Sequence, residues 1–482
     1  KEENADNIKI SFEVNDYELV EQKLKKRNFT KISIKNKDIN SFTEKNYPDL
    51  PSFSKLIIVP DGTKPIVKFS VESKRKYSNM NIIPSQGYTR DSEKEADTEI
   101  DLKKYKNYKQ PGAVRITETG IMRNYTVARV AINPFRYSSE KEELEVYENI
   151  DITINFESTG RKLPKIDKGS KNINMMLKNL AVNSETVDRL ETDDPGSYLF
   201  VYNGDTVLEV LNYLVEWKRK MGYEVNMLNV WEGSGSAMQV KESIVQAYNS
   251  YDNPPEYICL VGDAGASTTQ IPTFYESYYF NISGDYPYSL LDGEDNFPDA
   301  LVSRITFNNN TQLATIISKI RNYEMNVAQD NQWLNNYLLV GDPIDSGIST
   351  IHTMKYIRQL IEGLNPNATF DEVYSSPFDL NINESINEGA AAFYYRGFGG
   401  TSQWNSNDID ELVNTGKYPF ATLLTCFTGE FDGSQTSVIE AFLKSGTPNN
   451  PTGGCAVIGA SSATHTCFNN LMTGSIANAV HY

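Results

Sequence analysis

The sequence has few histidines and cysteines, no long apolar run and no excess of basic residues. Three histidines in 482 residues (His352, His465 and His481) do not favour a zinc site built on histidine. Four cysteines, none of them in CxxC spacing, do not make a disulfide framework. No apolar run approaches the roughly 20 residues of a membrane-spanning helix. The formal net charge of −17 argues against binding to nucleic acid or to an anionic membrane surface.

The first part of the chain is rich in residues that favour β-strands. Val, Ile, Tyr and Phe alternate there with polar residues. The strand-like segments are 8–14, 55–60, 65–72, 123–137 and 143–156. Residues 158–172 then carry Gly, Pro and many Lys residues without periodicity, which is typical of a linker or a cleavable segment. We therefore predict a β-rich domain at 1–160 and a linker or activation segment at 161–193.

After residue 194 the pattern changes to short apolar strands alternating with amphipathic helices. The apolar runs are SYLFVYNG, EVNMLNV, EYICLVGD, WLNNYLLVGDP, AAAFYYRG, YPFATLLTC and GGCAVIGASS. This alternation predicts an α/β fold with a mostly parallel sheet that helices cover on both faces. Ligands bind beyond the C-terminal ends of the strands in such sheets. The loops to inspect therefore follow Gly262, Tyr395, Thr425 and Gly459.

Cys426 ends the apolar run FATLLTC, so we expect its thiol where a strand leaves the sheet. Backbone NH groups of a following turn can stabilise a thiolate there. The alternative is a small buried hydrophobe, which we expect for Cys259 and Cys455. A right-handed crossover places the strands 390–395 and 420–425 side by side or nearly so, which brings residue 398 near Cys426. A cysteine nucleophile needs a base, usually histidine, but Phe398 cannot accept a proton.

The segments YYRGFGGTSQW and LLTCFTGEFDG resemble two motifs of the gingipain-type cysteine peptidases. In that family a histidine stands between the glycines of the first motif, and the nucleophilic cysteine follows a hydrophobic strand in the second. The order of the motifs, their spacing and the preceding segments ICLVGD and GDYPYSLLDGEDNFPDALVSRI also match. The resemblance covers Asp194 to Tyr482, and the β-rich first part is similar to the family's N-terminal propeptide. It implies a caspase-like α/β domain at 194–482 that continues past Tyr482.

The same resemblance assigns roles to single residues. It implies that Cys426 is the nucleophile, that Phe398 stands at the position of the histidine base, and that the NH groups of Gly399 and Cys426 form an oxyanion hole. Asp285 aligns with the acidic residue that binds a P1 arginine, which implies cleavage after Arg or Lys. A loop cap or a calcium ligand is an equal alternative for Asp285, because DGEDNFPD nearby is rich in carboxylates. Glu276 is a candidate for the acid that orients the base.

The missing base has a direct consequence for activity. Without it a thiol stays largely protonated at neutral pH, and no group returns a proton to the leaving amine. Losing one member of such a unit removes several orders of magnitude of rate. His465, directly after the strand GGCAVIG, is a candidate substitute base, although an exposed loop histidine is the more common case. His352 is expected at the surface or in a packing contact. Cys467 belongs to the same loop as His465, which is expected near Cys426, and this proximity suggests a disulfide between Cys426 and Cys467.

Three functions stay open at this point. The first is an extracellular or cell-surface cysteine endopeptidase zymogen, nearly inactive as written, whose prodomain blocks the active site. Phe398 is then a natural loss or an introduced substitution, and cleavage sites are expected between Arg161 and Lys178 or at Arg189. The second is a pseudopeptidase that binds peptides or partner proteins through the same cleft, and the third is an adhesive or structural surface protein. The partners expected are protein or peptide substrates and the intramolecular prodomain, with no required cofactor, no metal other than a structural calcium, no nucleic acid and no membrane span.

Overall fold

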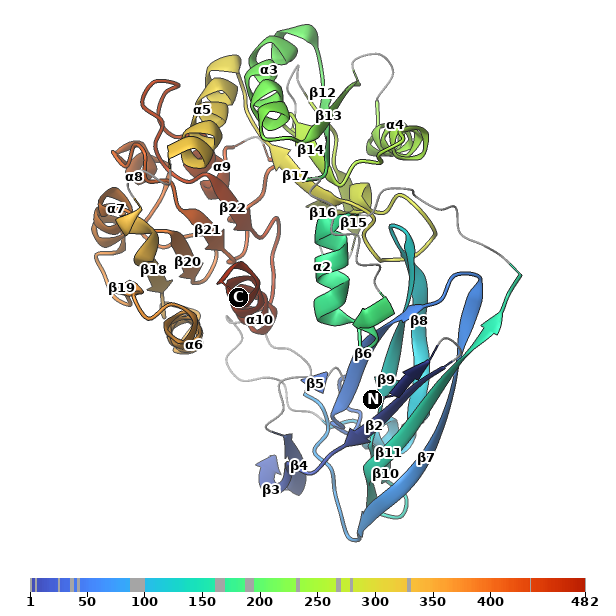
Figure 1. Ribbon diagram of the computed structural model, residues 1–482. Helices are drawn as coiled ribbons and strands as arrows, with labels where there is room; N and C mark the ends of the chain where they lie inside the picture. The colour runs from blue at the N-terminus through green and yellow to red at the C-terminus, as the bar shows by residue number, and fades with distance from the viewer. Residues whose placement is uncertain are drawn as a thin grey trace. The chain divides into compact units, whose positions relative to one another are not determined.

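The computed structural model divides into two compact units (Figure 1). The structure describes residues 2–4, 7–24, 27–34, 39–40, 44–86, 100–160, 170–186, 195–230, 235–265, 270–277, 281–326, 331–433 and 435–481. Unit 1 consists of Lys1–Thr89, Glu95–Asp193 and Leu290–Asp299, and unit 2 consists of Arg90–Lys94, Asp194–Ser289 and Ala300–Tyr482. The short segment Leu290–Asp299 therefore belongs with the N-terminal unit, although it lies far along the chain.

Unit 1 is built mainly from antiparallel strands. One sheet has the order β1–β2–β11–β10 with β7 also paired to β11, another has the order β5–β6–β9–β8, and β3 pairs with β4. The strands are β1 (Glu2–Asn4), β2 (Asn7–Glu13), β3 (Tyr17–Leu24), β4 (Arg27–Ile34), β5 (Ile39–Asn40), β6 (Ser52–Val59), β7 (Thr63–Tyr77), β8 (Val114–Met122), β9 (Tyr125–Ile132), β10 (Phe135–Ser138) and β11 (Glu143–Ser158). In β11 the buried residues Ile150, Ile152 and Ile154 alternate with polar ones, so one face of the sheet covers the core.

The structure differs from the predicted linker in the middle of residues 161–193. A helix, α2 (Lys171–Leu180), forms there and buries Ile173 and Leu177 in a cluster with strand residues of unit 1. The Ser170 hydroxyl accepts a hydrogen bond from the Ile173 NH at 3.0 Å and so caps the helix start. The many lysines of this segment made the helical spacing of its apolar residues difficult to recognise in the sequence. Residues 161–169 and 187–194, which include Arg161 and Arg189, lie outside the described residues.

Unit 2 contains two parallel sheets, where the sequence predicted one. Their orders are β13–β12–β14–β17 and β19–β18–β20–β21–β22, and a separate hairpin pairs β15 with β16. The strands are β12 (Ser197–Tyr202), β13 (Glu224–Asn229), β14 (Tyr257–Val261), β15 (Phe274–Ser277), β16 (Asn281–Gly284), β17 (Leu301–Ile305), β18 (Asn336–Gly341), β19 (Thr369–Val373), β20 (Ala392–Arg396), β21 (Phe420–Leu423) and β22 (Ala456–Gly459). The predicted neighbours β20 and β21 do pair, with Tyr394 opposite Thr422.

Helices cover both faces of the second sheet (Figure 1). The helices of unit 2 are α3 (Asp205–Lys220), α4 (Ala237–Ser250), α5 (Asn310–Asn326), α6 (Ser349–Leu364), α7 (Phe378–Glu388), α8 (Ser406–Asp410), α9 (Val438–Lys444) and α10 (Thr466–His481). Tyr394 of β20 packs with α6 and α10, whereas its neighbours Phe393 and Tyr395 pack with α7, α8 and α9. All five residues of β20 are buried, which explains why this strand reads as a continuous apolar run.

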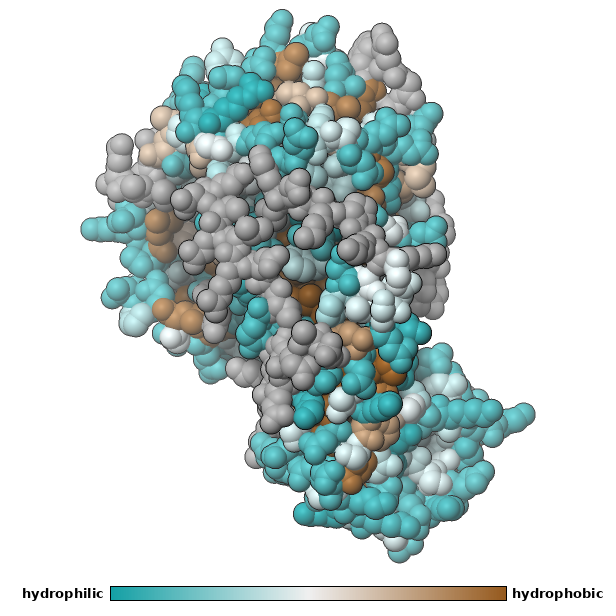
Figure 2. Space-filling model, turned by 45° about the vertical axis from the view of Figure 1, so that its right-hand side comes forward, coloured by the Kyte–Doolittle hydropathy of each residue, from teal (hydrophilic) through white to brown (hydrophobic). Residues whose placement is uncertain are grey.

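The described surface is mainly hydrophilic in the view of Figure 2. Figure 2 shows hydrophilic residues over most of the coloured surface, with apolar residues scattered among them. Among the described residues, no helix combines the length and the apolar character needed to cross a bilayer.

Candidate active site

The ends of strands β20 and β21 bring residues 398 and 426 into neighbouring segments. The Gly397 NH donates to Thr425 Oγ1 at 3.1 Å, and the Gly400 NH donates to the Cys426 carbonyl oxygen at 2.8 Å. Gly399 and Gly400 have φ angles of 52° and 85°, in the left-handed region that glycine adopts without strain. The glycine-rich turn is thus held directly beside the candidate nucleophile.

The Cys426 thiol is half-buried and lies against the loop that follows β22. The Thr464 NH donates to Cys426 Sγ at 3.3 Å, and the Thr464 carbonyl and hydroxyl oxygens lie 3.4 and 3.6 Å from the sulfur. The next residue is fixed to the same loop, because the Phe427 NH donates to the Ser462 carbonyl oxygen at 3.2 Å. A backbone NH aimed at sulfur stabilises negative charge on it. Sequence reasoning placed this loop near Cys426 but gave no sign of Thr464.

The position predicted for the base holds a half-buried phenyl ring, and the exposed Gly399 follows it. The backbone contacts of the turn do not depend on the side chain of residue 398. The turn therefore keeps its geometry with Phe398 in place. The oxyanion role of the Gly399 and Cys426 NH groups stays a prediction.

A buried arginine that sequence reasoning missed ties the site together. Arg396, the last residue of β20, donates through Nε to Asn470 Oδ1 at 2.8 Å and through Nη2 to the Thr466 carbonyl oxygen at 3.4 Å. Its Nη1 donates to the Leu424 carbonyl oxygen, two residues before Cys426. The guanidinium joins β20, the end of β21 and the start of α10, and its permanent positive charge lies against the Leu424 carbonyl group, two residues before Cys426. The sequence feature that could have indicated this role is the position of Arg396 directly after a buried apolar run.

Asp285 is engaged by an internal arginine. Arg304 of β17 approaches it with Nε 2.6 Å from Oδ2 and Nη2 2.7 Å from Oδ1, and the Thr273 hydroxyl donates to Oδ1 at 2.9 Å. Arg304 Nη1 also donates to the carbonyl oxygens of Ile271 and Gly262, at 2.7 and 2.9 Å. A substrate guanidinium would have to displace Arg304 from this carboxylate, so recognition of a basic P1 residue by Asp285 stays a prediction that this geometry does not favour.

The hairpin β15–β16 lies beside the loop that follows Cys426. The Ser283 hydroxyl donates to Asp432 Oδ1 at 2.8 Å, and the Ser461 hydroxyl donates to the Ser283 carbonyl oxygen at 2.7 Å. Glu276 lies on the same hairpin as an exposed residue. Within the described part of the chain, no hydrogen bond or ion pair joins Glu276 to Phe398 or Cys426, and its role as an orienting acid stays a prediction.

The three histidines have different environments. His465 is half-buried next to Thr464, and its ring centroid lies 6.0 Å from that of Phe468. His352 is exposed on α6. His481 Nε2 lies 2.8 Å from the Tyr394 hydroxyl, and burial lowers its pKa. Only His465 is adjacent in sequence to a residue that contacts the Cys426 sulfur.

The four cysteines are free thiols, so the disulfide considered between Cys426 and Cys467 is not formed. Burial raises the pKa of Cys259 to about 12 and that of Cys455 to about 11. Neither thiol is a thiolate at neutral pH, as expected for cysteines that act as small hydrophobes.

The carboxylates of the segment DGEDNFPD bind backbone NH groups of unit 1. Asp295 Oδ2 accepts from the Ile121 NH at 2.8 Å, and Asp299 Oδ1 accepts from the Arg123 NH at 2.7 Å. A Cβ atom added to Gly120 would lie 2.4 Å from Asp295 Cγ, so glycine is required at this close approach. The described residues contain no group of three side chains that could hold a metal ion. A structural calcium stays a prediction, and no step is assigned to a metal.

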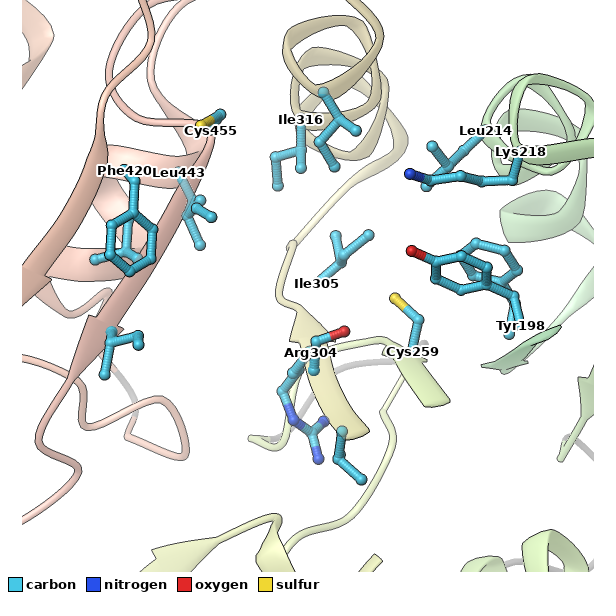
Figure 3. A pocket seen from close by; sticks show the side chains of 17 residues that line it. Tyr198, Leu214, Lys218, Cys259, Arg304, Ile305, Ile316, Phe420, Leu443 and Cys455 are labelled. Atoms are coloured by element: carbon cyan, nitrogen blue, oxygen red, sulfur yellow. The ribbon is translucent and has the colours of Figure 1, made fainter. Parts of the chain in front are cut away.

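A cavity of about 430 Å³ lies between the two sheets of unit 2, and Cys426 is not among its lining residues. Phe420, Leu443 and Cys455 line one wall, and Tyr198 and Lys218 line the opposite one (Figure 3). Lys218 Nζ is 2.6 Å from Glu324 Oε1, so the charge of this lysine is paired. The cavity is chiefly apolar, and the alternation of strands and helices gave no indication of it.

Two family models match successive parts of the chain. A model described as Peptidase family C25 matches residues 191–481, and one described as Propeptide_C25 matches residues 2–189. Gingipain R1 from Porphyromonas gingivalis is 24% identical over 446 residues, which cover 87% of this chain and 43% of that protein. Lys-gingipain HG66 from the same species is 24% identical over 455 residues, covering 88% and 26%. The chain thus spans less than half the length of these two relatives.

Solved structures show the same fold. The crystal structure of the Arg-specific cysteine proteinase gingipain R matches with a TM-score of 0.54 and 21% identity, covering 60% of this chain and 68% of that one. The complex of the pro- and mature domains of Porphyromonas gingivalis RgpB matches with a TM-score of 0.53 and 20% identity, covering 59% and 69%.

Proposed function

We propose, from the premise that this chain belongs to peptidase family C25 and carries a C25 propeptide, that Cys426 is the nucleophile of a cysteine endopeptidase cleft whose activity is very low. The single observation that carries the proposal is the position of the thiol. Cys426 follows the buried strand β21, receives the Thr464 NH and lies beside the turn that contains Phe398. Location outside the cell or on its surface is part of the same proposal and rests on the family resemblance.

The chemistry of the proposal follows from the groups present. The thiolate of Cys426 attacks the carbonyl carbon of a peptide bond, and the NH groups of Gly399 and Cys426 stabilise the developing oxyanion. The step needs a base to take the thiol proton and to give a proton to the leaving amine. Phe398 does neither, so the first step is slow although the nucleophile and the turn are retained.

Replacing Phe398 by histidine tests this assignment. In the full-length chain, Phe398→His should raise hydrolysis of fluorogenic peptides at least about 100-fold, and should yield self-cleavage within 161–193. The double variant Phe398→His, Cys426→Ala should be inactive, which separates hydrolysis at this thiol from contamination. If Phe398→His folds, and its thiol is intact by mass spectrometry, but hydrolysis does not rise, the peptidase assignment is wrong.

Binding without turnover is the second candidate, and one observation favours it. Two exposed aromatic side chains lie on elements next to Cys426: Phe427 directly follows it and is 43% exposed, and Tyr275, 54% exposed, lies on the hairpin that contacts the loop after Cys426. Tyr and Phe at a cleft suit the capture of peptide side chains. Binding of Arg-, Lys- and Phe-containing peptides to Cys426→Ala, measured by fluorescence anisotropy, tests this candidate. The same panel tests cleavage after Arg or Lys, which we retain as the preference implied by the family.

A further inference from the structure

We propose that His465 accepts the proton of the Cys426 thiol and thereby supports the low residual activity of the proposed function, in which Phe398 takes no proton. This inference rests on the proposed function, because it names a base for the same nucleophile. Its starting point is the loop after β22, where three polar atoms of Thr464 lie within 3.6 Å of Cys426 Sγ.

Covalent geometry bounds the distance between the two groups. The Thr464 carbonyl oxygen is 3.4 Å from Cys426 Sγ. Across a trans peptide, that oxygen and the next Cα are about 2.8 Å apart, so the His465 Cα lies within about 6 Å of the sulfur. An imidazole extends from Cα by a length that covers most of this gap, so the proposal requires a staggered rotamer of His465 that turns the ring toward the sulfur. His465 is the one histidine for which such a bound follows.

The backbone of His465 is held in place. The Asn469 NH donates to the His465 carbonyl oxygen at 3.0 Å, which joins the residue to the first turn of α10. The Asn469 side chain donates to Thr464 Oγ1 at 2.6 Å. Asn469 therefore holds both Thr464 and His465 through hydrogen bonds. Thr464, which contacts the sulfur, and His465, which carries the imidazole, are therefore held together in one loop.

The charges around the pair decide how the base works. Arg396 donates to the Thr466 and Leu424 carbonyl oxygens, next to His465 and Cys426, and the start of α10 adds a partial positive charge. Glu430 and Asp432 are the acidic residues of the loop that follows Cys426. Positive charge favours a thiolate and opposes an imidazolium. In the proposed step His465 acts as a general base during attack.

The proton balance of the cycle is complete with these two side chains and water. His465 takes the thiol proton as the Cys426 sulfur bonds to the substrate carbonyl carbon. The imidazolium gives this proton to the leaving amine as the C–N bond breaks, which leaves a thioester on Cys426. His465 then takes a proton from the attacking water and returns it to the sulfur as the thioester is cleaved.

The test uses the fact that the chain has only three histidines. Mass spectrometry of the full-length chain after brief iodoacetamide treatment reports the alkylation rate at Cys426 separately from the other cysteines. His465→Gln should lower this rate at pH 7 about tenfold and shift its pH profile to higher pH. His352→Gln, an exposed histidine on α6, is the matched control and should leave the profile unchanged.

Chemical rescue separates a base from a structural residue. In His465→Gly, added imidazole should restore part of the alkylation rate and of the residual peptide hydrolysis, which a packing role would not allow. An unchanged pH profile in His465→Gln, or no rescue in a folded His465→Gly, overturns the inference. Phe398→His supplies its own base and is independent of this result: its activity supports the proposed function even where His465 fails, and its inactivity removes the proposed function itself.

Discussion

Asp285 and Arg304 form a two-point ion pair, with one Arg304 nitrogen 2.6 Å from Oδ2 and another 2.7 Å from Oδ1 of the carboxylate. The side chains are 17% and 6% exposed, so most water has been removed from both charges. Removing one partner of a buried pair leaves the other uncompensated. We expect Asp285→Asn to lower the free energy of unfolding by about 3 kcal/mol, measured by urea denaturation.

An exposed ion pair provides the matched control for Asp285→Asn. Glu362 is 2.9 Å from Arg358 across one turn of α6, and both side chains are more than 40% exposed. Glu362→Gln should change stability by less than about 1 kcal/mol. If Asp285→Asn is equally mild while binding of Arg-containing peptides weakens, Asp285 acts on substrate and not as the partner of Arg304.

Arg396 should matter both for stability and for the thiol. Arg396→Met removes the donors to the Leu424 and Thr466 carbonyl oxygens, so the buried acceptors lose a partner. We expect a loss of about 3 kcal/mol in urea unfolding and a slower alkylation of Cys426 at pH 7, since the nearby positive charge is lost. Lys220→Met, at the exposed C-terminal end of α3, should change neither quantity appreciably. An alkylation rate that is unaffected in folded Arg396→Met would falsify the electrostatic role.

Strand ends could be predicted from the sequence because buried parallel strands read as continuous apolar runs. The apolar runs before Phe398 and before Cys426 predict where two strands end. The handedness of crossover connections predicts that these two strands are neighbours, and the pairing of Tyr394 with Thr422 confirms it. The division of the unit 2 strands into two sheets could not be predicted, because an apolar run indicates a buried strand but not its pairing partner.

Contacts made by loops were beyond sequence reasoning. Thr464 reaches the sulfur, and Arg304 reaches Asp285, only through loop conformations that have no periodic signature. Phe297 shows the limit most clearly: it lies in the second half of the chain, yet it packs in the cluster of Ile173 and Leu177 in unit 1. The residues of DGEDNFPD are those of an ordinary acidic loop, so the sequence does not indicate that this segment packs with the N-terminal part of the chain.

Asp299 should make unit 1 more stable at mildly acidic pH. Burial raises the pKa of Asp299 to about 6, although the NH groups of Leu291, Asp292 and Arg123 oppose the shift. Because this pKa is above the ordinary carboxyl value, folded unit 1 takes up a proton between about pH 6 and pH 4 that the unfolded chain does not bind. Stability should therefore rise as the pH falls from 7 to 5, by about 1 kcal/mol.

Hydrogen exchange in the full-length chain measures this effect in unit 1 alone. Amides of β8 and β9, corrected for intrinsic exchange rates, should be better protected at pH 5 than at pH 7. Asp299→Asn cannot titrate and should remove the difference, whereas Asp61→Asn, at the turn between β6 and β7, should keep it. Equal protection at the two pH values in the unaltered chain would contradict the assignment.

Lys319 should give unit 2 the opposite dependence on pH. Its ammonium group lies between α5 and α9, where Nζ donates to the Leu443 and Phe442 carbonyl oxygens at 2.9 and 3.3 Å, and burial lowers its pKa to about 7. The unfolded chain keeps this proton up to an ordinary lysine pKa, so unfolding takes up a proton between about pH 7 and pH 10.5. Stability should therefore rise by about 3 kcal/mol from pH 7 to pH 9.5 on account of this residue. Urea unfolding followed by the fluorescence of Trp333 and Trp404 reports on unit 2, and Lys319→Met should lose this increment while the exposed Lys220→Met retains it. If Lys319→Met and the unaltered chain differ equally at both pH values, Lys319 is charged throughout, and its contacts with the two carbonyl oxygens and neighbouring dipoles outweigh its burial.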